Sequence, residues 1–204
     1  MADPVQQTTA TYDAIGTTYA ARWQKQGALL NHIDRFLEWV PAGGVVVDVG
    51  CGPGLDTAVF RRRGFQAAGV DLSWGMMQAG RRQVGVLPFA QADMRALPLR
   101  AAAVDGLWAS ASLLHLPHEE AGGVLHSFAR FLKPGGVLYV SVKKGRDAGW
   151  VPNPYFGDSP RFFAFWQPEE LDALLTQAAF RIESGWQEDG ERDTWLNRLA
   201  LRMA

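Results

Sequence analysis

Three glycines follow an apolar run near residue 50 and could hold a phosphate-bearing or nucleoside ligand. The run 45–49 is rich in valine, and Gly50, Gly52 and Gly54 come after it at alternate positions. Such a run predicts a parallel strand covered on both faces, and glycines allow a tight turn without a Cβ in a ligand's way. Leu55 stands where a dinucleotide-binding turn has its third glycine, and the Lys-Ser/Thr pair of a P-loop is absent.

Two acids follow the next apolar runs. Asp71 lies about twenty residues after the glycines, where a carboxylate can accept hydrogen bonds from two ribose hydroxyls. The alternative is that Asp71 caps the helix expected at 74–82, a role for which Ser73 competes. Asp93 follows the run 87–91, where it could bind an adenine amino group.

In this order, the motifs resemble those of the class I S-adenosylmethionine-dependent methyltransferases. VDVGCGPG (47–54) is similar to the D-x-G-x-G-x-G cofactor loop of that family, GVDLS (69–73) to its ribose acid and QADMRALPL (91–99) to its adenine-edge loop. AVDGLWASASLLHL (103–116) resembles its fourth strand, and FLKPGGVLYVSV (131–142) the helix, turn and strand that follow. The resemblance covers about half of the chain, from near 45 to 143, and leaves the methyl acceptor open.

The resemblance implies S-adenosylmethionine as cofactor, S-adenosylhomocysteine as product and a set of cofactor contacts. The contacts in the core are Asp48, Gly50, Cys51, Gly52, Gly54, Asp71, Leu72, Met76, Asp93, Met94 and Ser110. Cys51 is the single cysteine, and no partner base is placed beside it by the sequence, so we expect it to fill space rather than to react.

The opening segment contains Tyr12, Tyr19 and Trp23 at helical spacings of seven and four. This pattern alone is also typical of a buried stripe. Related methyltransferases commonly fold an N-terminal helix over the cofactor, with the second tyrosine of a similar Y-D-x-x-x-x-x-Y pattern near its methionine end. The resemblance therefore implies a helical lid within residues 1–40, with Tyr19 near the methionine group and Arg22 facing its carboxylate.

Helices and strands alternate along the rest of the chain. Strand-like runs lie at about 45–49, 66–71, 87–91, 104–109, 136–143, 180–187 and 194–202, and helical patterns at 29–40, 74–82, 117–132 and from 168 onward. This order predicts an α/β fold with a doubly wound, mostly parallel seven-stranded sheet, helices on both faces and ligands at the carboxyl ends of the strands.

We expect one domain over 1–204, because 48% hydrophobic content is enough for a full core and no linker composition divides the chain. Within it, 45–143 would be the cofactor-binding core and 144–204 the acceptor-side segment with the last strands. The net charge of −1 offers no global attraction to nucleic acid. A polar N-terminus without a signal-peptide pattern, and no long apolar run, predict a cytoplasmic protein that does not enter membranes.

The acceptor side is the least specified part of the sequence. His115 follows the fourth strand and is the candidate general base or acceptor contact, with a packed or capping histidine as the alternative. An aromatic cluster at 150–166, expected to be a structured loop, either lines an acceptor pocket or belongs to the core. Its candidate substrate contacts are Tyr155, Phe163 and Trp166. The basic cluster that begins at Lys143 is a further candidate for acceptor binding.

These features together favour a small-molecule acceptor. Methylation of tRNA or protein and a silent cofactor-binding module remain alternatives from the sequence alone. A nicotinamide oxidoreductase is a weaker one: Tyr139 and Lys143 match Y-x-x-x-K, but on a strand the two residues lie about 13 Å apart, too far to act as a pair.

Overall fold

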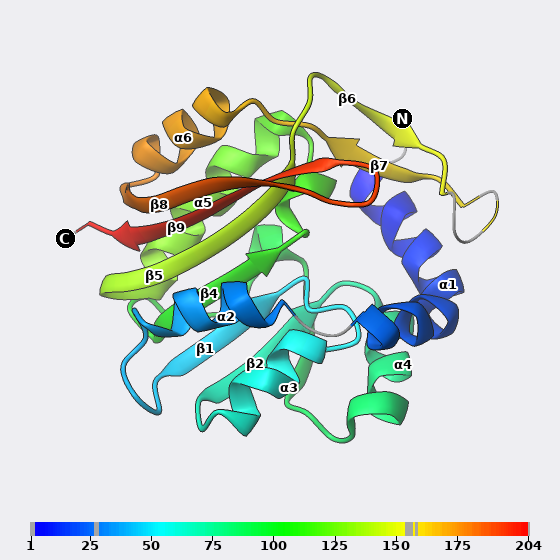
Figure 1. The fold of residues 1–204 in the computed structure, drawn as a ribbon, viewed down its shortest axis with the longest axis horizontal. Coiled ribbons are helices and arrows are strands. Elements are labelled where there is room, and N and C mark those ends of the chain that lie inside the picture. Colours follow the sequence, from blue (N-terminus) through cyan, green and yellow to red (C-terminus); the bar gives the residue numbers. More distant parts are fainter. Residues whose placement is uncertain (1–2, 27–28, 154–156, 158, 204) are drawn as a thin grey trace.

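The computed structural model describes residues 3–26, 29–153, 157 and 159–203. Its centre is a seven-stranded sheet in the order β3-β2-β1-β4-β5-β9-β8 (Figure 1). The strands are β1 (Val45–Val49), β2 (Gln66–Asp71), β3 (Phe89–Gln91), β4 (Val104–Ser110), β5 (Leu132–Lys143), β8 (Phe180–Asp189) and β9 (Thr194–Arg202). β9 pairs antiparallel with β5 and β8, and the other pairs are parallel. This is the mostly parallel sheet that the sequence predicts.

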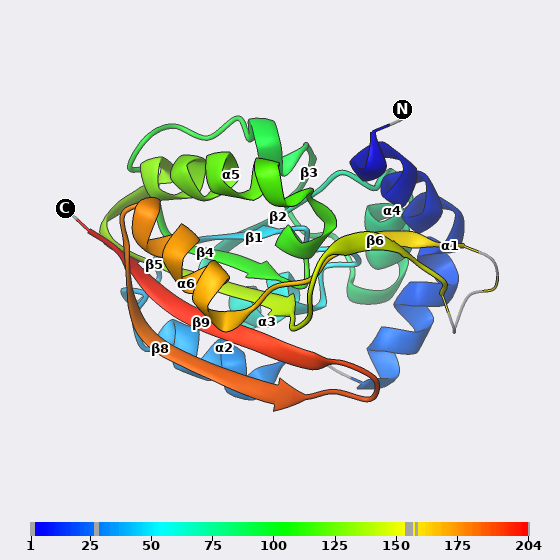
Figure 2. The same ribbon diagram turned by 90° about the horizontal axis from the view of Figure 1, so that it is seen from above.

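Helices cover both faces of the sheet (Figure 2). They are α1 (Pro4–Gln26), α2 (Leu30–Leu37), α3 (Leu55–Arg62), α4 (Trp74–Val84), α5 (His118–Phe131) and α6 (Pro168–Gln177). Alternate strand residues point to opposite faces: Val47 and Leu107 belong to one core with α5 and α6, while Val46 and Trp108 belong to another with α2 and α3. None of these helices is long and apolar enough to cross a membrane, as far as the described residues go.

The strand order reverses beside β1, whose neighbours are β2 and β4. Crossovers on either side of such a point leave a crevice outside the carboxyl ends of the strands. The glycine turn lies there, with Gly50 at a φ of 73°, a left-handed conformation that favours glycine. A Cβ on Gly50 would lie 2.3 Å from the Cβ of Ser112. Gly50 therefore lets the β1 turn and the segment after β4 approach each other closely.

The aromatic segment after β5 forms a hairpin where the sequence predicts a loop. β6 (Ala148–Val151) and β7 (Arg161–Ala164) pair antiparallel as a separate two-stranded sheet. Trp150 pairs with Phe162, and their rings meet edge to face at 5.9 Å. Such aromatic pairs stabilise strand pairing. Pro152 and Pro160, two of the residues that predict a loop, lie in the connection between the two strands.

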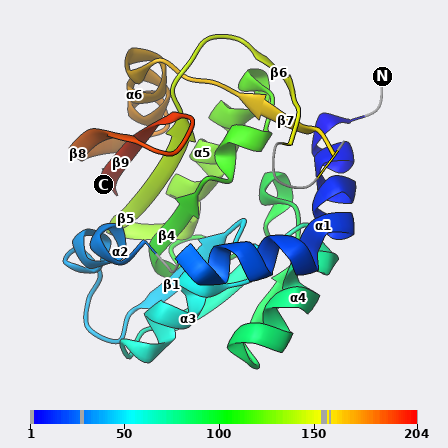
Figure 3. The ribbon, with the colours of Figure 1, turned by 45° about the vertical axis from the view of Figure 1, so that its right-hand side comes forward.

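Helix α1 packs against the start of α4 at the edge of the sheet (Figure 3). Asp13 Oδ1 accepts hydrogen bonds from Ser73 Oγ at 2.7 Å and from the Gly75 amide at 2.8 Å. A Cβ on Gly16 would lie 2.8 Å from the carbonyl carbon of Gly75, so two glycines make the close approach possible. The first helix is thus attached to the element that follows the predicted ribose acid.

The contact of α4 with the glycine turn yields a stability prediction. A Cβ on Gly80 would lie 2.1 Å from the Pro53 carbonyl oxygen, so Gly80→Ala should lower the free energy of unfolding by about 1–3 kcal/mol. Gly123 is the control: it is exposed on helix α5 and a Cβ there meets nothing within 4 Å. Gly123→Ala should raise stability by about 0.5–1 kcal/mol. Chemical denaturation measures both, and equal effects would contradict the packing described.

Candidate active site

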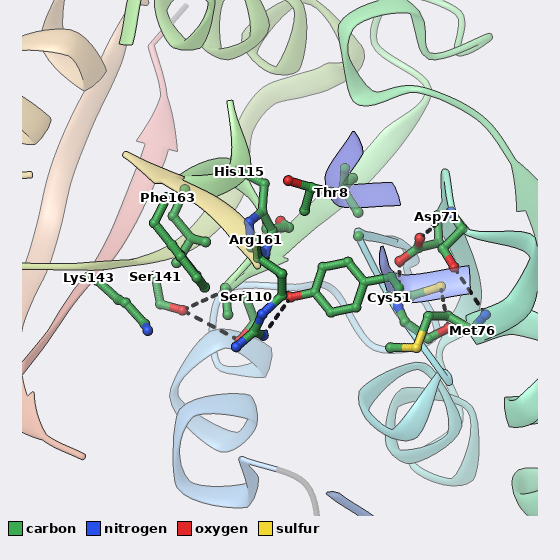
Figure 4. A pocket seen from close by; sticks show the side chains of 18 of the residues that line it. Thr8, Cys51, Asp71, Met76, Ser110, His115, Ser141, Lys143, Arg161 and Phe163 are labelled. Atoms are coloured by element: carbon green, nitrogen blue, oxygen red, sulfur yellow. Dashed lines mark hydrogen bonds between the residues drawn. The ribbon is translucent and has the colours of Figure 1, made fainter. Parts of the chain in front are cut away.

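A cavity of about 880 Å³ lies at the carboxyl ends of the central strands (Figure 4). The strand ends contribute Asp48, Asp71, Ser110, Ser141 and Lys143 to its lining, and α1, β7 and the β8–β9 turn contribute residues from above. This volume is within the usual range for small-molecule and cofactor sites. Of the predicted cofactor contacts, the cavity is lined by Tyr19, Asp48, Gly50, Cys51, Gly52, Asp71, Leu72, Met76, Asp93, Met94 and Ser110.

Asp71 connects the glycine turn to α4. Its Oδ2 accepts a hydrogen bond from the Gly52 amide, and its Oδ1 accepts one from the Ser73 amide, both at 2.7 Å. Ser73, and not Asp71, is the N-cap residue of α4, since Ser73 Oγ accepts from the Met76 amide. Burial raises the pKa of Asp71 to about 6. The Asp71 side chain lines the cavity, and Asp71 is not the residue that caps α4.

A buried acid, Asp48, and a half-buried one, Asp56, lie near each other beside the glycine turn. Asp48 Oδ2 accepts a hydrogen bond from Thr57 Oγ1 at 2.6 Å, and Asp56 Oδ2 accepts one from Trp108 Nε1 at 3.0 Å. Burial raises the pKa of both carboxyl groups, and the charge of Asp56 raises that of Asp48 further. A cationic ligand group in the adjoining cavity would favour their ionised forms. In the sequence Asp56 looks like an ordinary residue in the first turn of a helix, so no motif predicts it as a cofactor contact.

Asp93 lies in the cavity wall but also takes part in an ion-pair network. Both of its carboxylate oxygens accept hydrogen bonds from Arg95, which also binds Asp3 and Glu120. A carboxylate has about four lone-pair sites, so contact with a ligand amino group remains compatible with this pairing. The network joins the segment after β3 to the start of α1 and to α5.

Two predicted cofactor contacts lie outside the cavity lining. Arg22 Nη2 forms an ion pair with Glu191 Oε2 at 3.2 Å, and the residue is not part of the cavity wall. Gly54 is on the far side of the turn, where a Cβ would lie 2.5 Å from the Phe89 ring. Tyr19 does line the cavity, and its ring meets that of Tyr12 edge to face at 5.5 Å.

His115 is held between α1 and β7. Its Nδ1 lies 2.8 Å from the Phe162 carbonyl oxygen, which can only accept, so Nδ1 carries the proton. Nε2 therefore accepts from the Tyr12 hydroxyl at 2.9 Å, and that hydroxyl accepts from Arg161 Nη1 at 3.0 Å. Burial lowers the pKa of His115 to about 3. The geometry thus favours a neutral, positioning histidine over a general base, because neither ring nitrogen is free to take a proton.

The aromatic candidates divide between the cavity wall and the core. Phe163 lines the cavity, with Lys143 Nζ 4.2 Å and the Arg161 guanidinium carbon 5.1 Å from its ring centre. Trp166 is buried in the core instead, 4.4 Å from the His118 ring, and does not line the cavity. Tyr155 lies outside the described residues. Phe163 belongs to β7, whereas Trp166 lies two residues beyond the end of that strand, in an isolated bridge with Lys144.

Several cavity residues had no signal in the sequence. Arg161 and Asn197 both line the cavity, and each belongs to a segment without a motif. Tyr139 and Lys143, which match Y-x-x-x-K in the sequence, both lie on strand β5, as the sequence predicts. The Tyr139 side chain is buried on the face covered by α2 and α3, where its hydroxyl donates to Asn197 Oδ1 at 2.8 Å.

Comparison with known proteins agrees with this arrangement. Residues 46–136 match the model of a methyltransferase domain family. The trans-aconitate 2-methyltransferase of Azoarcus sp. (strain BH72) is 39% identical over 104 residues, which are 50% of this chain and 40% of that protein. The malonyl-[acyl-carrier protein] O-methyltransferase of Enterobacter lignolyticus (strain SCF1) is 34% identical over 133 residues, or 64% of this chain and 52% of that protein. The chain therefore spans about half the length of the curated relatives it matches.

A solved structure extends the likeness of fold over the whole chain. The 1,6-didemethyltoxoflavin-N1-methyltransferase of Burkholderia thailandensis, in complex with 1,6-didemethyltoxoflavin and S-adenosylhomocysteine, has a TM-score of 0.79 at 20% identity. The alignment covers 100% of this chain and 92% of that one. The chain thus has the fold of the class I S-adenosylmethionine-dependent methyltransferases, and its residues 46–136 match a methyltransferase domain.

Proposed function

We propose that the protein transfers a methyl group from S-adenosylmethionine to a small molecule bound at the end of the cavity farthest from Asp71. The supporting observation is that one cavity is lined both by the glycine turn with Asp71 and by a second group of residues, Lys143, Arg161 and Phe163. Helix α1 and the β6–β7 hairpin, which pack against each other (Figure 3), both contribute residues to this part of the cavity. A covered pocket with apolar walls and a few polar groups fits a small acceptor better than a polyanion.

The residues fit the cofactor in three ways. Asp71 would accept hydrogen bonds from the ribose hydroxyls, while the turn at Gly50 and Gly52 leaves room for the backbone to approach the ligand. Asp48 and Asp56 would neutralise the methionine ammonium group, and Asp93 would bind the adenine edge. The cofactor supplies the methyl group on a sulfonium leaving group, so the protein has chiefly to align the acceptor with it.

The relatives support a small acceptor as well. One is named for trans-aconitate and another for a malonyl group on a carrier protein, and the toxoflavin enzyme is in complex with a small heterocycle. Their acceptors differ, as do the parts of their chains beyond the match. The methyltransferase domain match covers residues 46–136, so the acceptor must be argued from this cavity's own residues.

The acceptor class can be tested directly. Protein incubated with methyl-labelled S-adenosylmethionine and a fractionated cell extract should transfer label to the small-molecule fraction. Protein heated beforehand is the control. Label confined to the tRNA or protein fraction would overturn the small-molecule proposal, and no transfer to any fraction would favour a silent binding module.

Asp71 gives a pH-dependent prediction for cofactor binding. Asp71→Asn should weaken S-adenosylhomocysteine binding by about 1.5–3 kcal/mol at pH 7.5, because a charge-assisted acceptor is lost. The pKa of Asp71 is raised to about 6 by burial. Below that pH its carboxyl is protonated in the free protein, so the advantage of wild type over the variant should shrink between pH 6.5 and 5. Calorimetry measures both affinities, and a constant gap would exclude Asp71 as the titrating ligand group.

The lid role of α1 predicts a change in hydrogen exchange. Tyr12 and Tyr19 line the cavity, so a ligand in contact with them should oppose local opening of α1 (Pro4–Gln26). Exchange there should slow when S-adenosylhomocysteine is added. Helix α6 (Pro168–Gln177) lies on the sheet away from the cavity and should not change. Equal exchange in α1 with and without ligand would leave its tyrosines as packing residues.

A further inference from the structure

Arg161 places a positive charge inside the acceptor end of the cavity. It extends from β7 into the middle of the pocket, between Phe163 and Asp71 in the view of Figure 4. Its Nη1 donates to the Tyr12 hydroxyl, and the guanidinium lies over the Tyr12 and Phe163 rings. Its Nε is buried and has no hydrogen-bond partner. Among the described residues no carboxylate forms an ion pair with it.

Two acids that line the same cavity form ion pairs or hydrogen bonds with other residues. Asp193 binds Lys143 at 2.8 Å, and Glu188 binds His32 at 2.8 Å. The carboxylate of Asp71, on the opposite side of the pocket, is taken by two backbone amides. Within the described part of the chain, Arg161 thus has no carboxylate in an ion pair with it, and it lies between aromatic rings, where water screens its charge less than at a surface.

Asn197 adds a second unused donor. Its side chain lines the cavity and is 1% exposed, and its Oδ1 already accepts from the Tyr139 hydroxyl. Its Nδ2 has no partner. A buried donor without a partner is unfavourable, and a ligand oxygen would satisfy it. Arg161 and Asn197 therefore both have donor groups that oxygen atoms of a ligand could satisfy. The charge of Arg161 also favours a negatively charged ligand.

His115, the candidate general base, is not arranged to remove a proton from an acceptor. His115 has its Nδ1 on the Phe162 carbonyl and its Nε2 on the Tyr12 hydroxyl. An alcohol, phenol or ammonium acceptor must lose a proton during methylation, and so needs a base. A carboxylic acid is already ionised at neutral pH and needs none.

We infer that the acceptor is a carboxylic acid, that its carboxylate is bound by Arg161, with Asn197 as a further donor in the same cavity, and that one carboxylate oxygen is the methylated atom. This inference rests on the proposed function. A lone pair of the carboxylate oxygen forms the bond to the methyl carbon while the carbon–sulfur bond breaks, and its electron pair stays on sulfur. The products are a neutral methyl ester and the neutral thioether S-adenosylhomocysteine, and no proton is exchanged. Loss of charge on the acceptor weakens its attraction to Arg161 and favours release.

The linkage of the transferred methyl group tests the reaction. The protein is incubated with methyl-labelled S-adenosylmethionine and single acids, namely trans-aconitate and a set of aliphatic and aromatic carboxylic acids. The primary alcohol of each acid serves as its matched control. The inference expects label in at least one acid and in none of the alcohols, released as volatile methanol by mild alkali. Methyl ethers and methylamines keep their label under these conditions.

Variants of Arg161 test the binding group. Arg161→Gln should raise the KM for the acid roughly tenfold or more, since it removes a charged hydrogen-bond donor. The affinity for S-adenosylhomocysteine, measured by calorimetry, should stay unchanged. Arg161→Lys should restore part of the KM, because the charge is kept without the planar donor fork. Arg130→Gln, on the exposed side of α5, is the control and should alter neither value.

The outcomes distinguish failure of the carboxylate inference from failure of the proposed methyltransferase function. Alkali-labile label with the expected KM change supports a carboxylate acceptor. Alkali-stable label in small molecules leaves the proposed function intact and overturns this inference. Loss of S-adenosylhomocysteine affinity in Arg161→Gln overturns it too, since Arg161 would then bind the cofactor's own carboxylate. No label in any small molecule, from the extract or from the acid set, contradicts the proposed function and this inference with it.

Discussion

The hydrogen bonds of Asp71 hold together the parts on which the cavity depends. One carboxylate oxygen binds the Gly52 amide of the glycine turn and the other binds the Ser73 amide at the start of α4. Ser73 in turn donates to Asp13 of α1. The end of β2, the turn after β1 and two helices thereby keep fixed positions relative to one another. The cost is a buried carboxylate whose pKa is raised to about 6, and backbone amides offset part of that cost.

The cofactor half could be predicted from sequence because its determinants are local. A valine-rich strand, alternate glycines and an acid at the end of the next strand follow from short-range sterics and hydrogen bonding, and each was found near its predicted place. Small differences arise at the edges, where β5 begins at Leu132 although a turn-like Lys-Pro-Gly-Gly follows. The pairing of Val104 with Leu132 across a register shift accounts for this earlier start.

The acceptor half resisted prediction because its determinants are long-range. Arg161 and Tyr12 are 149 positions apart and meet only because α1 and the hairpin pack together. The proton position on His115 depends on the Phe162 carbonyl, and its low pKa depends on burial, neither of which a local pattern encodes. Trp166 and Phe163 look equivalent in sequence, but Phe163 lies on β7 and lines the cavity, whereas Trp166 lies beyond that strand and packs against His118 in the core.

Helix α1 touches both ends of the cavity through neighbouring residues. Asp13 accepts a hydrogen bond from the Gly75 amide at the start of α4. Tyr12 accepts one from Arg161, and Thr8 Oγ1 accepts one from the Phe162 amide of the hairpin. A ligand that shifted α1 at one end of the cavity would also shift it at the other. Thermodynamic linkage would then make the two binding equilibria reciprocal: whatever factor the cofactor applies to the affinity of the acceptor, the acceptor applies to the cofactor. A single helix would thus couple the affinities of the two ligands.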